Sequence, residues 1–302
     1  PIPTIGGLVL FLSFLIIYFD FLILKNISYF TYLSFCTLFF ILGFLDDIAI
    51  NIKPKIRLAF MIIFLIILVK YNNFYINKTG IDFLNYWIEN SEIFSLIFIS
   101  LCFLFIVNGA NLIDGYNGLL GIHTLIILIN LFLLNYLNYN IDLANFLFFL
   151  ILILVIFLWF NFPKAKIFLG DSGAYFLGTL IAVSTIMTSI ANPNVSPFYF
   201  CILLFYLFFE VFFSFFRKLI KKSSPLEPDS KHLHMLLYKR MLKKNNDKLK
   251  SNYSVSIIIN VIYLLLTIPA ILMMDNGMFC KYYSIVFFIT YIFSYKIVKA
   301  NT

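Results

Sequence analysis

Charged side chains are scarce in this 302-residue chain, where they make up 12% of the residues against 62% for hydrophobic ones. Together with a mean hydropathy of +0.98, this composition excludes a soluble globular protein. Cysteine is rare as well. The four cysteines stand singly, with no CxxC pair and no paired spacing, which indicates packing residues.

Long apolar runs recur along the chain, and as helices they would cross the roughly 30 Å of hydrocarbon in a bilayer. None alternates apolar and polar residues as a barrel strand does. We therefore expect an all-α, polytopic membrane helix bundle that forms a single domain over residues 1–302. About ten transmembrane helices are predicted, at 5–24, 28–45, 56–71, 92–108, 117–136, 142–160, 172–191, 196–217, 254–274 and 280–298. The chain starts at PIPTIGG without a Met, and one further N-terminal span would make eleven.

Lysine and arginine are distributed unevenly between the two sides that these spans define. Of the 22 basic residues, only those at positions 25, 70, 78 and 281 lie in one set of connections. The alternate set holds all the others and is therefore predicted to be cytoplasmic. The net charge of +8 then faces anionic lipid headgroups and anionic substrates on one side of the bilayer. Nucleic acid is not expected as a partner, because these residues serve topology.

Acidic residues converge on the same side. An Asp costs about 2.5–3.5 kcal/mol at the centre of a membrane helix and is usually retained for function. Asp46 and Asp47 lie in GFLDD, Asp114 in NGANLIDGYNGLLG and Asp171 in KIFLGDSG. Taken singly, each has a simpler explanation: solvated residues at a helix end, a turn rich in Asn and Gly, or an N-cap. Their conjunction on one face favours a functional site.

Two of the three histidines, His232 and His234, lie in the longest cytoplasmic connection. Their segment, HLHMLLYKRMLKK, also has the amphipathic character of a helix at the lipid surface. Basic residues flank the acidic positions, among them Lys55 and Arg57. Carboxylates surrounded by cations are typical of metal-dependent phosphate chemistry, in which oxygen ligands hold Mg²⁺ while Lys and Arg bind phosphate oxygens.

Glycines and asparagines accompany the acids. The glycines of DGYNG (115 and 118) and of GDSG (170 and 173) would let the backbone approach a phosphate or nucleotide at the start of a helix. Asn111 and Asp114 would lie one turn apart if that turn is helical, so both could face one pocket.

Five segments together closely resemble the motifs of the polyprenyl-phosphate N-acetylhexosamine-1-phosphate transferase family, in the order of that family. They are PIPTIGG (1–7), GFLDD with PKIRL (43–47 and 54–58), NGANLIDGYNGLLG (108–121), WFNFPKAKIFLGDSG (159–173) and PDSKHLHMLLYKR (228–240). The resemblance implies an enzyme of the bacterial inner membrane with its active site on the cytoplasmic face. It would transfer a sugar 1-phosphate, N-acetylglucosamine first among the N-acetylhexosamines, from a UDP-sugar to undecaprenyl phosphate and release UMP. This would be the first membrane step of a cell-envelope polysaccharide or O-antigen pathway.

The resemblance also implies roles for individual residues. Asp171 would bind Mg²⁺, or Mn²⁺ in its place, and Asp46 and Asp47 would position or deprotonate the lipid phosphate, with Asp47 assisting the metal. The remaining catalytic and substrate-binding positions implied are Asp114, Asn111, Asn117, Asn161, Phe168, Lys55, Arg57, His232 and His234. Direct attack of the lipid phosphate on the donor is favoured, and a covalent aspartyl-phosphate route stays open.

Two positions depart from the family pattern. Asn117 stands where Asp is common, which weakens a direct metal role there. Met235 stands where the pentapeptide transferase has a third histidine, which places the chain nearer the branch that initiates O-antigen or teichoic-type polymers.

Two other functions are weighed against the transferase. A non-catalytic carrier or flippase for polyprenyl-linked sugars would also want basic residues, but its charges should lie near the midplane of the bilayer, where these spans lack them. A CDP-alcohol phosphotransferase would need its own spacing of acidic residues on one pair of helices, which is absent from the sequence. A homodimer is left open.

Overall fold

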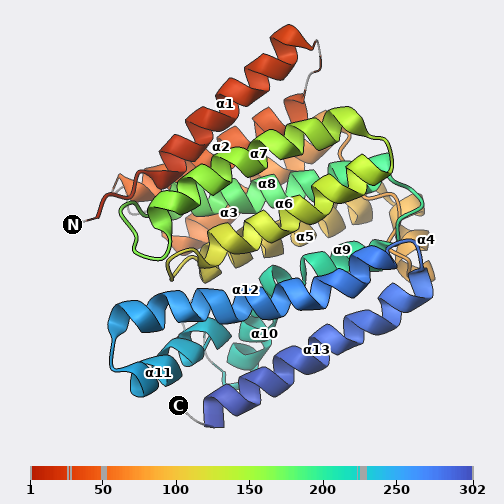
Figure 1. Ribbon diagram of the computed structural model, residues 1–302. Coiled ribbons are helices and arrows are strands. Elements are labelled where there is room, and N and C mark those ends of the chain that lie inside the picture. Colours follow the sequence, from red (N-terminus) through yellow and green to blue (C-terminus); the bar gives the residue numbers. More distant parts are fainter. Residues whose placement is uncertain are drawn as a thin grey trace.

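The computed structural model describes residues 2–25, 27, 29–48, 53–222, 224 and 230–300, and in these ranges it consists of helices without strands. The expected all-α membrane bundle is thus confirmed (Figure 1). The helices are α1 (Gly6–Leu24), α2 (Phe30–Asp47), α3 (Pro54–Asn72), α4 (Asp82–Asn90), α5 (Glu92–Ile113), α6 (Leu119–Leu137), α7 (Ile141–Asn161), α8 (Gly170–Ala191), α9 (Pro197–Leu203), α10 (Phe205–Ile220), α11 (Leu233–Asn245), α12 (Lys248–Leu272) and α13 (Gly277–Ala300).

Eight of the described helices are long and apolar enough to cross a membrane, or up to nine if α9 and α10 count as one bent span. The prediction of about ten included α3, which forms over its expected range and has 19 residues. Lys55, Arg57 and Lys70 place three charges in this helix. Because two of these charges lie in its first turn and the third in its last, α3 has only a short uncharged centre.

The span predicted at 196–217 is broken. Its two helices, α9 and α10, meet at an angle of 72°. At the break, the backbone carbonyl of Leu203 accepts a hydrogen bond from the hydroxyl of Tyr263 in α12. A side chain that takes a carbonyl out of the helical ladder is a recognised cause of a kink, and no Pro or Gly at this point of the sequence announces it.

The span predicted at 92–108 extends further than expected, because α5 continues to Ile113. The Asn108 side chain donates to the carbonyl of Leu104 one turn back, so its amide is paired within the helix. A Cβ on Gly109 would lie 2.2 Å from the carbonyl oxygen of Leu207, which shows how closely α10 packs here. Half of the NGANLIDGYNG segment is therefore helix.

Helix α8 is the centre of the bundle. It packs against α1, α2, α5 and α6, and most of its residues are buried. The start of α8, the ends of α2 and α5, and α11 all lie at one end of the bundle, on the left in Figure 1, whereas α4 lies at the other. The start of α1 and the end of α13 also lie at the left-hand end.

Candidate functional site

The first turn of α8 is held by the last residue of α2. The two carboxylate oxygens of Asp47 accept hydrogen bonds from the backbone N–H groups of Asp171 and Ser172, at 2.8 and 3.0 Å. The first amides of a helix lack partners within the helix and favour negative charge. Asp47 of α2 therefore caps α8. The simpler interpretation of the sequence, in which Asp171 is itself the N-cap residue, is not what the structure shows.

Glycines bring the neighbouring helices onto this turn. A Cβ on Gly43 of α2 would lie 2.4 Å from the carbonyl oxygen of Asp171, and a Cβ on Gly7 of α1 would lie 2.3 Å from the backbone nitrogen of Gly173. Gly170 has a φ of +76° and lies beside the Asp47 carboxylate. At these positions glycine is needed because neighbouring protein atoms leave no room for a side chain. Of the four glycines expected to let a phosphate approach the backbone, only Gly115 faces open space.

Asn111 and Asp114 reach the same turn from the end of α5. The amide of Asn111 donates to Oδ1 of Asp171 at 2.8 Å. Desolvation, together with the negative charges of Asp171 and Asp47, raises the pKa of Asp114 to about 7. Three carboxylates, from α2, from α8 and from the residue that follows α5, are therefore close enough to repel one another.

A cation adjoins these acids. Arg57, in the first turn of α3, forms an ion pair with Asp46, and its guanidinium lies 5.5 Å from the centre of the Tyr175 ring in α8. The Asp46 carboxylate is thus paired, unlike a solvated helix-end residue. Lys55 is exposed on the same first turn of α3.

Asn161 and Asn117 connect the loops beside the site. The Oδ1 atom of Asn161 accepts from the backbone N–H of Gly118, and its amide donates to the carbonyl of Ile167. The Asn117 amide donates to the carbonyl of Pro163, and its backbone N–H donates to Asn252 of α12. Both residues are predicted to bind substrate, and the structure places them as cross-links between the loops that follow α5 and α7.

Phe168 lies in the loop before α8, and 39% of the residue is exposed. Its backbone is bound to the N-terminal segment: Phe168 N–H donates to the carbonyl of Pro3, and Gly6 N–H donates to the carbonyl of Phe168, each at 2.9 Å. A third bond joins Gly7 N–H to the carbonyl of Leu169 at 2.8 Å. The PIPTIGG segment therefore fastens the loop that leads into Asp171.

His232 and His234 lie at the start of α11 and are both buried. Their rings are parallel, with centroids 5.5 Å apart. The ring of Tyr116 meets His234 edge-on at 5.9 Å, and Tyr116 belongs to the same loop as Asp114. The amphipathic pattern of their segment favoured a helix at the lipid surface, but the two histidines, which are predicted to contact the substrate, are packed against the loop that carries the acidic site.

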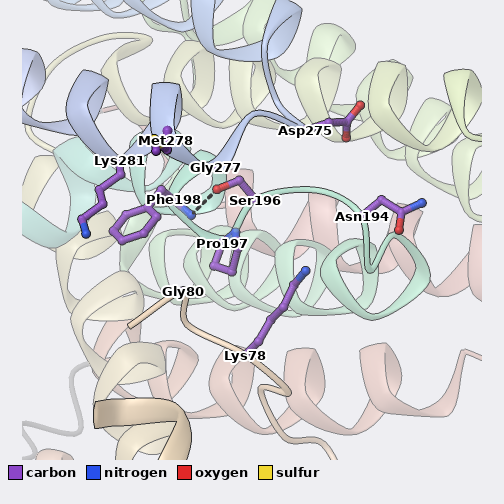
Figure 2. Close-up of a pocket in the computed structure, with 10 residues that line it drawn as sticks. All are labelled: Lys78, Gly80, Asn194, Ser196, Pro197, Phe198, Asp275, Gly277, Met278 and Lys281. Carbon is purple, nitrogen blue, oxygen red and sulfur yellow. Dashed lines mark hydrogen bonds between the residues drawn. The ribbon is translucent and has the colours of Figure 1, made fainter. Parts of the chain in front are cut away.

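A pocket of about 370 Å³ lies elsewhere in the molecule (Figure 2). Lys78, Phe198 and Lys281 line it, together with the loops that follow α8 and α12. Since α8 has 22 residues, its two ends are about 33 Å apart at 1.5 Å per residue. This pocket belongs to the other end of the bundle from Asp171.

Comparison with known proteins gives this geometry a family. The model of glycosyl transferase family 4 matches residues 29–189, which is just over half of the chain. The chain belongs to this family. The matched region contains the whole acidic site on α2, α5 and α8, and it ends before the histidines of α11.

Relatives within the family carry two kinds of name. The chain is 34% identical over 200 residues, 62% of its length, to a phospho-N-acetylmuramoyl-pentapeptide-transferase from Dictyoglomus turgidum and spans 60% of that protein. It is 26% identical over 246 residues, 80% of its length, to an undecaprenyl-phosphate alpha-N-acetylglucosaminyl 1-phosphate transferase from Thermotoga maritima and spans 70% of it. A pentapeptide-transferase from Nitratiruptor sp. is 27% identical over 214 residues, 62% of this chain and 60% of its own length.

Most of the predicted site residues are thus brought together at one end of the family fold. Asp47, Asp171 and Asn111 are joined by hydrogen bonds, with Asp46 and Asp114 beside them. In the described part of the chain, no group of three or more His, Cys, Asp or Glu residues is placed to hold a metal ion by itself. Pro1, Pro228 and Asp229 of the motifs lie outside the described residues.

Sequence reasoning missed Glu210. This residue of α10 is 1% exposed, and its carboxylate contacts His232 at 3.0 Å. An acidic residue within FYLFFEVFFSFF, inside a predicted span, is a signal that could have found it, because such a residue is expensive to bury and usually has a partner.

Proposed function

We propose that this protein transfers a sugar 1-phosphate of the N-acetylhexosamine type from a UDP-sugar to undecaprenyl phosphate and releases UMP. N-acetylglucosamine is the sugar we favour, since the relative that aligns with 80% of the chain is named for it. The reaction would take place at the cytoplasmic face of the bacterial inner membrane, as the first membrane step in making an envelope polysaccharide such as an O-antigen.

One observation carries the proposal: Asp47, Asn111 and Asp171 meet at the first turn of α8, beside the Arg57–Asp46 ion pair. A carrier of lipid-linked sugars has no need of carboxylates gathered next to a cation at one end of the bundle. A phosphoryl transferase does need them, because it must neutralise phosphate charge and align two phosphates.

The chemistry exchanges one phosphorus–oxygen bond for another. An oxygen of the lipid phosphate attacks the β-phosphorus of the donor, and the bond from that phosphorus to the bridging oxygen breaks. The bridging oxygen leaves with UMP. Arg57 supplies positive charge next to Asp46 for the phosphate oxygens, while Asp47 and Asn111 keep the Asp171 carboxylate in place.

The carboxylates fit a magnesium ion. Asp171, with Asp47 beside it, would hold Mg²⁺ or Mn²⁺, and when bound the ion neutralises charge on the phosphates. Mg²⁺ is commonly bound by one or two carboxylates together with substrate phosphates and not by a cage of protein ligands. Burial is the main reason why the pKa of Asp114 is raised, and the negative charges of Asp171 and Asp47, which a cation would offset, add to the shift.

The test is UMP release by the purified protein in detergent, given undecaprenyl phosphate and a panel of UDP-N-acetylhexosamines, with Mg²⁺ or with EDTA. We expect release that requires both substrates and the metal, and the best donor names the sugar. Asp20→Asn, an exposed change in α1 away from the site, serves as a matched control for Asp171→Asn. Binding of lipid phosphate without UMP release from any donor would support the carrier instead.

A further inference from the structure

Glu210 is a buried acid that the proposed reaction has not used. It lies in α10 between aromatic residues, with 1% of its surface exposed. An ionised carboxylate away from water is costly unless donors satisfy it. What surrounds Glu210 therefore indicates what it does.

Both of its oxygens contact the start of α11, and the hydroxyl of Tyr206 also interacts with the carboxylate. Oε2 lies 3.0 Å from Nδ1 of His232, and Oε1 accepts the backbone N–H of Leu233 at 3.2 Å. Oε1 is also 4.0 Å from Nδ1 of His234. Because Leu233 is the first residue of α11 and His232 its N-cap, Glu210 occupies the position of a capping residue supplied by a different helix.

The same contacts fix how the imidazole rings present their other nitrogens. The proton on a histidine ring is placed by the hydrogen bond that the opposite nitrogen makes. A carboxylate facing Nδ1 of His232 keeps a proton on that atom. At His234, the hydroxyl of Tyr206 lies 3.4 Å from Nδ1 and also interacts with Glu210, so Tyr206 connects this nitrogen to the same carboxylate.

Nε2 of His234 is buried and has no hydrogen-bond partner among the described residues. A buried polar atom without a partner is rare in a folded protein and calls for a ligand or another explanation. The adjoining ring of Tyr116 connects His234 to the loop of Asp114. A UDP-sugar bound beside Asp114 could supply the hydrogen bond that this nitrogen lacks.

We infer that Glu210 is a positioning residue that fixes the ring of His232 and the start of α11, so that the histidine pair meets the diphosphate of the UDP-sugar. The inference rests on the proposed function for its substrate. It assigns Glu210 no contact with the reacting atoms. Tyr206 performs the corresponding task for His234.

A direct test is ¹⁵N NMR of protein labelled at histidine, which has only three histidines to assign. We expect Glu210→Gln to change the protonation pattern of the His232 ring nitrogens, and Tyr206→Phe to change that of His234, while His123 keeps its signals. Glu92→Gln makes the same chemical change at an exposed residue near the start of α5 and should leave all three unchanged. Unaltered His232 signals in a folded Glu210→Gln protein would overturn the inference, whether or not UMP release is found.

Kinetics then separate positioning from plain stabilisation. Glu210→Gln should raise the KM for the UDP-sugar at least tenfold and leave the KM for undecaprenyl phosphate within twofold, with partial recovery in Glu210→Asp. A structural role alone would lower the active fraction and leave both KM values as they are. If Glu210→Gln fails to fold, Glu210→Asp decides the matter: the shortened side chain should still raise the donor KM, and an unchanged donor KM contradicts the inference. Failure of the wild type to release UMP would refute the proposed function and leave the NMR result standing.

Discussion

Asp47 accepts a hydrogen bond from the backbone N–H of Asp171 at 2.8 Å, across 124 residues of sequence. The end of one helix thereby sets the start of another. Both residues are expected to act in phosphate chemistry, but their hydrogen bonds differ. Asp47 caps the start of α8, whereas the side chain of Asp171 accepts a hydrogen bond from Asn111. Substitutions at this turn and around it can distinguish a catalytic role from a structural one.

Asp171→Asn should abolish most activity without weakening the fold. The new amide can still accept the hydrogen bond of Asn111 through its oxygen, and losing one negative charge relieves repulsion with Asp114 and Asp47. We expect UMP release to fall by about 100-fold or more, the order found when a charge-stabilising group is removed from an active site, while the melting temperature stays level or rises. A drop in melting temperature that accounts for the lost activity would speak against a catalytic role.

Gly43→Ala should damage the site by pushing two helices apart. The added Cβ would lie 2.4 Å from the carbonyl oxygen of Asp171, and that oxygen belongs to a backbone that cannot rotate away. We expect lower activity and a lower melting temperature. Gly277→Ala is the matched control, since the nearest atom to its added Cβ is 3.8 Å away. Equal effects of the two changes would show that the close approach of α2 and α8 is unimportant.

Asn161→Leu should destabilise the protein because it breaks the connection between two loops. It leaves the buried N–H of Gly118 and the carbonyl of Ile167 without their partner. An unsatisfied buried group such as the Gly118 N–H costs about 1–3 kcal/mol, so we expect the melting temperature to fall by several degrees. Asn138→Leu removes an exposed side chain that bonds only within its own helix and serves as the control. A loss of activity at an unchanged melting temperature would instead favour the substrate contact predicted for Asn161.

The sequence predicted which residues form the site, but not which of them hold the structure together and which are free to bind substrate. Asp46, Asp114 and Asp171 stand out because acids are rare in so apolar a chain, and topology alone puts them at one end of the bundle. That Asp47 caps α8 or that Asn161 links two loops depends on which backbone amides lie within 3 Å, which no spacing in the sequence encodes.

The positions of the helices were predictable from the sequence, whereas the break in one of them was not. Helix positions follow from hydrophobic runs, so most spans formed within a few residues of their expected bounds. The break between α9 and α10 was missed because its partner, Tyr263, lies about 60 residues further along the chain. Glu210 was overlooked because single residues inside apolar runs were not weighed as sites.

The free energy of unfolding should decrease at acidic pH because His234 is buried. Burial lowers the pKa of His234 to about 4 from an ordinary value of 6.5, although the nearby Glu210 opposes that shift. Below about pH 6.5 the unfolded chain takes up a proton that the folded chain refuses, so stability is full above this pH and declines as the pH falls toward 4, by up to about 1.4 kcal/mol per pH unit.

The measurement is the melting temperature between pH 7.5 and 5, compared with that of His234→Gln, which cannot titrate. The wild type should lose more of its melting temperature over this interval than the variant does. Parallel curves would mean that His234 is protonated in the folded protein as readily as in the unfolded one.

The convergence of helices on the first turn of α8 has a consequence for biosynthesis. Gly7, Gly43, Asp47 and Asn111 are all translated before residue 170, yet each finds its partner only when Asp171 and its neighbours arrive. A nascent chain with its first five helices already inserted therefore carries an Asp47 carboxylate without its hydrogen-bond donors until α8 is delivered. Ribosome stalling before α8 should leave those helices poorly packed and open to membrane proteases.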